Sequence, residues 1–228
     1  MKGAEVYSVL QVKRIHQLYH ANSITTSATF LRLGGLASRE HVEHHGLAQT
    51  SQYTDEIDQR FGIWNDVFTD SVDIHARIKN RNQYGPVLFI LDTKILTTLP
   101  VDIDVLITKS NPTKWANGQE HPDRYFTTPA ELAAGLIKGT FDQMITYRIP
   151  NGLLPFGAHL QQIILDDPKV NRPDNIGNYA ITQQALQEAA AIGEVATPIS
   201  QRTCEAECKC CQFYAANPKW VQQFFSVA

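Results

Sequence analysis

The apolar run between Gly85 and Asp92 constrains the fold of this chain more than any other segment. Val, Leu, Phe, Ile and Leu follow one another without interruption after Gly85-Pro86, which is a turn signal. Such a run, bounded by turn residues, predicts a buried strand. Further strands are predicted over residues 105–108, 144–149 and 160–165, the second of them from its alternating pattern.

Short helices are predicted between the strands from their start and stop signals. Gly34-Gly35 ends the first, Ser38 is a good N-cap for the second, and Thr128-Pro129 begins a later one. Short helices alternating with antiparallel strands favour an α+β fold over a doubly wound sheet. The sequence has no Gly-x-Gly-x-x-Gly motif, so a dinucleotide would have to bind without a Rossmann phosphate loop. The predicted helices cover residues 27–33, 38–46, 51–61, 128–132, 181–192 and 218–225.

Length and composition indicate a globular protein. The 228 residues are enough for one large domain or two small ones, and we expect a main domain over residues 1–170 and a helical C-terminal extension over 171–228. Hydrophobic residues make up 43% and charged residues 19%, as in soluble proteins. The apolar runs are shorter than the roughly 20 residues that span a bilayer, and the N-terminus lacks a signal-peptide core. We therefore expect a cytoplasmic protein with no membrane partner.

The four cysteines all lie within eight positions near the C-terminus. They are Cys204, Cys208, Cys210 and Cys211, and no cysteine elsewhere can pair with them, which indicates a reducing compartment. Four soft ligands this close could hold zinc, although structural zinc sites usually use two separated C-x2-C arms. The favoured interpretation is a cysteine-rich surface loop that is prone to oxidation, with no metal.

Two short segments carry the strongest functional signal. Leu18-Tyr19-His20 lies near the start, and Phe141-Asp142-Gln143-Met144 leads into a predicted strand. The order of features along the chain resembles that of ADP-ribosyltransferases. It consists of an early histidine, a helix ending in Gly-Gly-Leu-Ala-Ser-Arg, a buried strand and then this late motif. The pattern is most similar to the DarT-like toxins of bacterial toxin–antitoxin and phage-defence systems, which modify nucleic acids, with the mRNA-modifying CmdT-like enzymes as another related group. The resemblance covers about residues 14–168.

The resemblance implies an α+β fold with a split NAD site between antiparallel sheets. Nicotinamide leaves the ribose of NAD+ and an ADP-ribose is passed to an acceptor, so NAD+ is the co-substrate. His20 would orient the nicotinamide ribose. The other residues expected to contact NAD+ are the hydroxyl residues Ser23, Thr25 and Thr26, and the aromatic residues Tyr125 and Phe126, which are equally compatible with a place in the core.

Gln143 occupies the position where the family has its catalytic glutamate. Glutamine keeps the size of glutamate but neither ionises nor accepts a proton, so this copy is expected to be inactive. An engineered Glu-to-Gln change is the favoured explanation, because the neighbouring segments fit the closing strands of the family. A natural pseudoenzyme and an ordinary strand residue are the alternatives.

A basic segment precedes the buried strand. We expect Arg77 to contact a phosphate or the transition state, and a group of substrate-binding residues to lie beside it. The alternative is a loop that faces water, and the net charge of −3 does not by itself indicate nucleic-acid binding. DarT-like enzymes carry a motif here that this chain does not match cleanly, so the choice between DNA and RNA stays open. The expected substrate-binding residues are Lys79, Arg81, Asn82 and Tyr84.

The function predicted from these patterns is transfer of ADP-ribose from NAD+ to a nucleic-acid base in a toxin–antitoxin or phage-defence system. An antitoxin protein is an expected partner, and the C-terminal extension is a place for it to dock. The alternatives are a protein-modifying transferase, an NAD glycohydrolase, and a pseudoenzyme that only binds NAD+ or nucleic acid.

Overall fold

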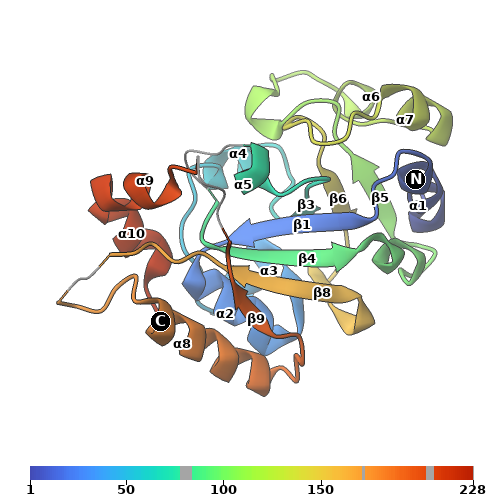
Figure 1. Cartoon of the computed structure of the whole chain (residues 1–228). Helices are drawn as coiled ribbons and strands as arrows, with labels where there is room; N and C mark the ends of the chain where they lie inside the picture. The colour runs from blue at the N-terminus through green and yellow to red at the C-terminus, as the bar shows by residue number, and fades with distance from the viewer. Residues whose placement is uncertain (78–83, 171–172, 204–207, 228) are drawn as a thin grey trace.

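The computed structural model describes residues 1–77, 84–170, 173–203 and 208–227. It is a mixed α+β structure with mainly antiparallel sheets, as the sequence predicts (Figure 1). The helices, with η for 3-10 helices, are α1 (Gly3–Val12), α2 (Ile24–Leu33), α3 (Arg39–His44), α4 (Asp55–Arg60), α5 (Ile74–Arg77), η1 (Thr93–Thr97), η2 (Pro112–Lys114), α6 (His121–Arg124), α7 (Pro129–Gly135), η3 (Gly157–His159), α8 (Tyr179–Ile192), α9 (Cys210–Ala216) and α10 (Pro218–Phe225). The strands are β1 (Gln17–Asn22), β2 (Gly35–Ala37), β3 (Val67–Thr69), β4 (Val87–Asp92), β5 (Asp104–Ile107), β6 (Ile145–Arg148), β7 (Leu153–Pro155), β8 (Leu160–Leu165) and β9 (Ile199–Gln201).

The central sheet has four strands in the order β1-β4-β8-β9. The strand predicted from the apolar run is β4, and Val87 to Leu91 are all buried. It pairs antiparallel with β1 on one side, placing His20 opposite Phe89, and with β8 on the other. β9 adds a parallel pair to β8. The buried strand predicted first is therefore an inner strand of this sheet.

A second sheet, in the order β3-β6-β5, meets the central sheet at β1. The contact is a single antiparallel bridge, in which Tyr19 N donates to Asp70 O at 3.0 Å and Asp70 N donates to Tyr19 O at 2.8 Å. A small third sheet pairs β2 with β7. Among the described residues the ladder pairing between the two larger sheets is limited to this bridge, and side chains of β1 and β3 face one space beside it.

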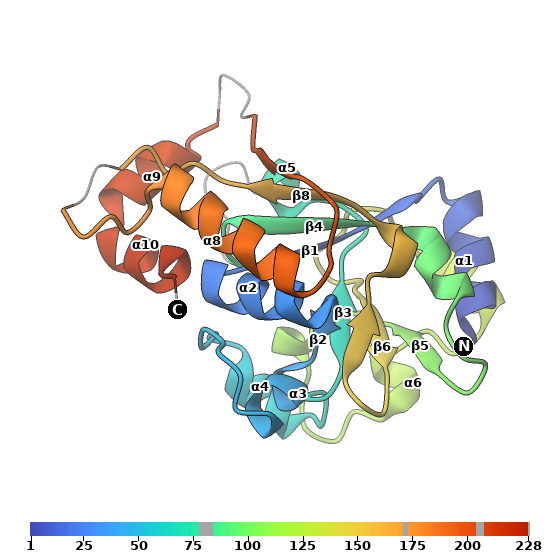
Figure 2. The ribbon, with the colours of Figure 1, turned by 90° about the horizontal axis from the view of Figure 1, so that it is seen from below.

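The residues after 170 share the core of the main domain. Helices α2 and α8 lie side by side on one face of the central sheet (Figures 1 and 2). Leu186 of α8, Tyr214 of α9 and Phe225 of α10 belong to the same buried cluster as Phe89 of β4. The predicted C-terminal extension thus contributes a strand and several helices to a continuous core. None of the helices in the described ranges is both long enough and apolar enough to cross a membrane.

Local capping explains most helix boundaries. Ser38 and Thr128 are N-caps as predicted, each accepting a hydrogen bond from the backbone N–H three residues later at 3.1 Å. α2 begins at Ile24 rather than at residue 27, because Ser23 is its N-cap. α1 was not expected, yet its buried residues Val6, Val9 and Leu10 have helical spacing, which is a readable signal.

Gly85, just before β4, lies directly against the backbone at the end of β1. Its φ is +129°, and a Cβ there would lie 2.1 Å from the carbonyl carbon of Asn22 and 2.4 Å from the nitrogen of Ser23. We expect Gly85→Ala to lower the free energy of unfolding by roughly 3 kcal/mol or more, because both the backbone conformation and the space are closed to a side chain. Urea unfolding measures the effect.

Gly46→Ala is the matched control for this prediction. Gly46 also has a positive φ, +61°, but nothing lies within 4 Å of its added Cβ. Gly46→Ala should lower the free energy of unfolding by only about 1–2 kcal/mol, the cost of placing alanine in the left-handed backbone conformation. Equal losses at the two positions would show that the close approach of Gly85 to β1 contributes nothing.

Candidate functional site

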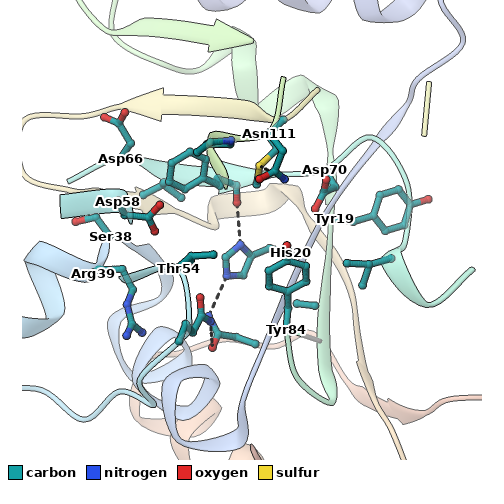
Figure 3. Close-up of a pocket in the computed structure, with 18 of the residues that line it drawn as sticks. Tyr19, His20, Ser38, Arg39, Thr54, Asp58, Asp66, Asp70, Tyr84 and Asn111 are labelled. Atoms are coloured by element: carbon teal, nitrogen blue, oxygen red, sulfur yellow. Dashed lines mark hydrogen bonds between the residues drawn. The ribbon is translucent and has the colours of Figure 1, made fainter. Parts of the chain in front are cut away.

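A cavity with a volume of about 110 Å³ lies where the two larger sheets diverge (Figure 3). It is lined by β1, the start of α3, residues of α4, and β3 with the residues that flank it. Tyr84, Asn111 and Met144 complete the wall. This volume is of the same order as a cavity that takes benzene, roughly 150 Å³, so the enclosed part suits one ring rather than a whole dinucleotide.

His20 lies at the centre of the cavity wall on β1 (Figure 3). Its Nδ1 is 2.8 Å from the carbonyl oxygen of Phe68, which assigns the proton to Nδ1. Burial lowers the pKa of His20 to about 4, and the hydrogen bond to Phe68 offsets part of that effect. The imidazole is therefore neutral at physiological pH. Its Nε2 accepts a hydrogen bond from Asn22 Nδ2 at 3.3 Å, so a ligand hydroxyl would bind there only by displacing Asn22.

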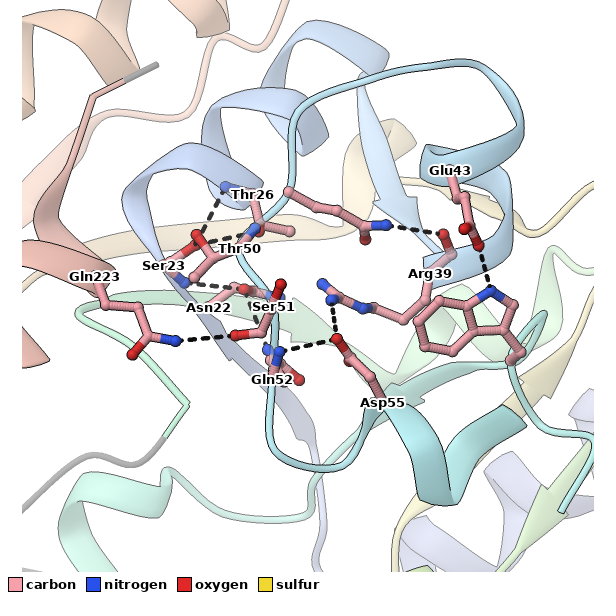
Figure 4. A network of polar contacts seen from close by, with 12 residues as sticks. Asn22, Ser23, Thr26, Arg39, Glu43, Thr50, Ser51, Gln52, Asp55 and Gln223 are labelled. Atoms are coloured by element: carbon pink, nitrogen blue, oxygen red, sulfur yellow. Dashed lines mark hydrogen bonds and ion pairs between the residues drawn. The ribbon is translucent and has the colours of Figure 1, made fainter. Parts of the chain in front are cut away.

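Arg39 contributes a cation that is only partly paired. It follows the N-cap Ser38, and its Nη2 donates to Asp55 Oδ2 at 2.8 Å (Figure 4). Its guanidinium also lies 5.5 Å from the ring of Trp64. Nε and Nη1 are buried without a hydrogen-bond partner in the described part of the chain. Buried N–H donors are costly to leave unpaired. If the Arg39 side chain turned toward a bound anion, these two donors would form charge-assisted hydrogen bonds with it.

Asp58 supplies a carboxyl group that titrates near neutrality. It is on α4 and lines the cavity. Burial, as the largest cause, and the charges of Asp55 and Asp66 raise the pKa of Asp58 to about 7, although Arg39 lowers it. A carboxyl group with a pKa close to 7 in a cavity is suited to accept and release a proton.

Asp66 also lines the cavity but is held by an ion pair. Arg148 donates to both of its carboxylate oxygens, at 3.0 and 2.8 Å. Burial raises the pKa of Asp66, while Arg148 opposes this rise. Asp66 therefore fixes β3 against β6, and Asp58 is the better candidate for proton transfer.

The hydroxyl residues predicted to contact NAD+ have hydrogen-bond partners within the protein, and Figure 4 shows those of Ser23 and Thr26. Ser23 Oγ donates to Thr50 Oγ1 at 2.7 Å, and Thr26 Oγ1 accepts from Thr50 N at 2.9 Å. Thr25 Oγ1 donates to the carbonyl oxygen of Ser226 at 2.9 Å. These bonds hold the start of α2 to the loop at Thr50 and to the C-terminal end, and none of the three residues lines the cavity.

Tyr125 and Phe126 are core residues, the alternative that the sequence left open. Tyr125 packs edge-to-face against Trp115, with ring centroids 5.4 Å apart, in a small buried cluster beside β5. Phe126 is 7% exposed and belongs to the main core. Neither residue lines the cavity.

Gln143 lies beside the cavity without lining it. Its Oε1 accepts from Ile137 N at 2.7 Å, and its Nε2 donates to Gly135 O at 2.9 Å. The amide thus joins the end of α7 to the segment before β6, and the next residue, Met144, faces the cavity. A catalytic group at Gln143 would need its side chain to face the cavity. The structure instead gives this side chain a structural role that needs both a donor and an acceptor.

We expect Gln143→Glu to destabilise the protein by about 1–3 kcal/mol at neutral pH. A carboxylate keeps the acceptor for Ile137 N but places negative charge against Gly135 O in a site that is 7% exposed. Thermal unfolding at several pH values measures this, and the loss should shrink in acid, where a protonated carboxyl can donate again. Gln162→Glu, on the exposed face of β8, is the control. Undiminished stability together with a gain of NAD+ cleavage would reinstate Gln143 as the catalytic position.

The basic segment is only partly described. Arg77 ends α5, but its side chain lies outside the described part, as do Lys79, Arg81 and Asn82. Tyr84 lines the cavity, and its ring stacks on Phe141 with centroids 6.1 Å apart. Of the expected substrate-binding residues, Tyr84 is therefore the one that the structure brings to the site.

A groove adjoins the cavity through two shared residues, Gln52 and Tyr84. Its aromatic wall comes from Phe213, Trp220 and Phe224 of the C-terminal section. Aromatic faces of this kind bind flat rings by stacking. The groove and the cavity are therefore neighbours, and Gln52 and Tyr84 stand between them.

The fold and the site define a mixed α+β protein with a cavity between two sheets. Comparison of the sequence with protein-family models found no match, and a search of the curated proteins found none with significant similarity. Sequence reasoning identified His20 and Tyr84 but missed Arg39 and Asp58. Arg39 had a signal, since it follows Gly-Gly-Leu-Ala-Ser in the segment that carries the resemblance, whereas Asp58 is one of several acids in a short helix.

Proposed function

We propose that this chain binds NAD+ at the cavity between β1 and β3 and transfers ADP-ribose to a nucleic-acid base. The observation that carries the proposal is the convergence on one cavity of a partly unpaired arginine, a neutral histidine and a carboxyl group of near-neutral pKa. These are Arg39, His20 and Asp58. The resemblance of the sequence to ADP-ribosyltransferases narrows the ligand from a nucleotide in general to NAD+.

The residues present fit a dinucleotide with a diphosphate. Arg39 offers a guanidinium whose Nε and Nη1 lack partners, and phosphate oxygens are well matched to its planar donors. A ribose hydroxyl would donate to His20 Nε2 by displacing Asn22 Nδ2. The enclosed volume suits a single ring, so the nicotinamide end would enter the cavity and the rest of NAD+ would lie outside it.

Asp58 is proposed as the general base. In the reaction the bond between nicotinamide and the ribose carbon breaks, and its electron pair leaves with nicotinamide. The acceptor atom then bonds to the same carbon, and Asp58 accepts the proton that the acceptor loses. A pKa of about 7 leaves a large part of Asp58 ionised at neutral pH, and its carboxylate also stabilises positive charge on the ribose. With Asp58 as the base, glutamine at position 143 would not make the chain inactive.

The aromatic groove supports a nucleic-acid acceptor. Stacking of a base on an aromatic side chain contributes about 1–3 kcal/mol and tolerates any base. Phe213, Trp220 and Tyr84 line this groove, where Trp220 is already stacked on Phe224. Contacts of Lys79, Arg81 and Asn82 with phosphates stay predictions, as does an antitoxin partner.

The test is to incubate the purified chain with NAD+ labelled in its adenosine half, together with DNA, RNA, protein or water alone. Nicotinamide release with label in DNA or RNA would support the proposal. Label in protein, or release into water without transfer, would replace it with one of the two alternative activities. Binding of NAD+ without release would leave a binding protein, and neither binding nor release would refute the NAD+ proposal altogether.

A further inference from the structure

Three side chains that are typical ligands of soft metals meet at one point, far from each other in sequence. They are His75 of α5, Cys208, and Cys210 at the start of α9, with α5 and α9 on the same side of the molecule (Figure 1). Their ligand atoms all lie within 4.8 Å of one another. His75 is 9% exposed and Cys210 is 2% exposed, so the cluster is largely closed to water.

We propose that His75, Cys208 and Cys210 form a binding site for a zinc-class divalent cation. Zinc takes thiolate sulfur at about 2.3 Å and imidazole nitrogen at about 2.0–2.1 Å, so two such ligands in a tetrahedron are about 3.5 Å apart. His75 Nε2 and Cys208 Sγ are 3.2 Å apart, close to this separation. One imidazole and two thiolates leave a fourth coordination position for water or another ligand.

Two local contacts support metal binding over chance proximity. The backbone N–H of Cys210 donates to Cys208 Sγ at 3.5 Å, an outer contact that stabilises a thiolate. The other ring nitrogen of His75, Nδ1, is buried without a hydrogen-bond partner among the described residues. Buried histidines normally form hydrogen bonds to oxygen or nitrogen atoms. The polar contact of His75 is instead the sulfur of Cys208, and a metal shared by the two residues would explain its burial.

The structure selects different ligands from those that the cysteine spacing suggested. Cys211 Sγ points to the carbonyl oxygen of Asp167, at 3.7 Å, and is not part of the cluster. Cys204 lies outside the described residues. The expected exposed loop is also corrected at Cys210, which is buried because it packs into the main core.

A bound cation would fasten the C-terminal section to the wall of the cavity. Val72 and Ile74, which shortly precede His75 in sequence, both line that wall. The same junction already holds a buried ion network, in which Arg202 pairs with Asp73 at 2.6 Å and also with Asp166. The metal would join α5 to Cys208 and the start of α9 by coordinate bonds, so its loss should loosen both segments.

The experiment uses the full chain, expressed with zinc and purified without a metal-binding tag. After dialysis we expect one zinc ion per chain in the parent. His75→Gln, Cys208→Ser and Cys210→Ser should each lose most of it, while Cys211→Ser, one residue away and outside the cluster, should keep it. Replacement of zinc by Co²⁺ should give the thiolate-to-cobalt charge-transfer band and the visible bands of a tetrahedral site in the parent and in Cys211→Ser.

Stability gives a second readout. A chelator should lower the thermal midpoint of the parent and of Cys211→Ser but leave the three ligand variants unchanged, because a cation that binds only the folded state stabilises it. The proposal is overturned if the parent holds no zinc, if its Co²⁺ spectrum lacks the thiolate band, or if Cys211→Ser loses metal as the ligand variants do. The Co²⁺ spectrum of the parent decides the matter even if a ligand variant fails to fold.

Discussion

Replacing Asp58 with asparagine is expected to slow NAD+ cleavage by a factor on the order of 10²–10⁴, the usual contribution of an acid–base group. Asparagine keeps the shape and polarity of the side chain at the cavity wall but cannot accept a proton. The rate of nicotinamide release under saturating NAD+ measures the effect. Binding of NAD+ should change little, because Asp58 is proposed to act on the acceptor and on charge that develops in the reaction.

The same variant has a predicted effect on stability that does not depend on activity. The pKa of Asp58 is about 7 in the folded protein, whereas an unfolded aspartate has a pKa near 3.9. Between these values the folded state holds a proton that the unfolded state has lost, so the parent should lose stability as pH rises from about 4 to about 7. Asp58→Asn should not show this loss, so its free energy of unfolding should rise relative to that of the parent as pH increases across that range.

The control for both measurements is Asp102→Asn, because Asp102 is exposed and outside the cavity. It should retain the cleavage rate and follow the pH profile of the parent. If Asp58→Asn cleaves NAD+ at the parental rate, Asp58 is not the base. If its stability also follows the parent across the pH range, the carboxyl of Asp58 is not buried enough to hold its proton.

Replacing Arg39 with alanine is expected to weaken NAD+ binding roughly 10- to 100-fold, because a hydrogen bond to a charged group contributes about 1.5–3 kcal/mol. The loss should appear in the dissociation constant, measured by calorimetry, and should become smaller for nicotinamide riboside, which lacks the diphosphate. A similar loss for both ligands would show that Arg39 contacts something other than phosphate.

Two further variants separate binding from stability. Arg39 also pairs with Asp55, so alanine leaves that carboxylate unpaired and should lower the thermal midpoint. Arg39→Lys keeps the charge but loses the planar donors, and it should bind NAD+ more weakly than the parent while remaining more stable than Arg39→Ala. Arg32→Ala removes an exposed arginine of α2 outside the cavity and should change neither property.

Strong local signals predicted much of the fold. The apolar run before Asp92 became β4, residues 160–165 became β8, and Ser38 and Thr128 cap the helices that follow them. Weak or short elements were missed, such as β9, whose three residues form a strand only because β8 lies beside them. The division at residue 170 also had a reasonable basis in the polar segment there, but the packing of α8 against α2 joins the two parts.

The candidate site was harder to predict than the strands that carry it. His20 and Tyr84 were found from motif and position, and both line the cavity. Ser23, Thr25 and Thr26 have the right chemistry, yet their hydroxyls bond within the fold. Those of Ser23 and Thr26 are used at the start of α2 and by Thr50, and that of Thr25 bonds to the carbonyl oxygen of Ser226. Gln143 and Met144 are neighbours just before β6, so their side chains point to opposite sides. The sequence does not say which of the two faces the cavity.

The sequence by itself determined the α+β class, the buried strand and the position of His20, because these depend on local patterns of polarity and on turn residues. Tertiary structure decided which polar groups are left without partners. Arg39, Asp58 and the cluster of His75 with Cys208 and Cys210 acquire their chemistry from burial and from neighbours distant in sequence. Both pKa values and metal sites depend on such three-dimensional surroundings, which no local pattern encodes.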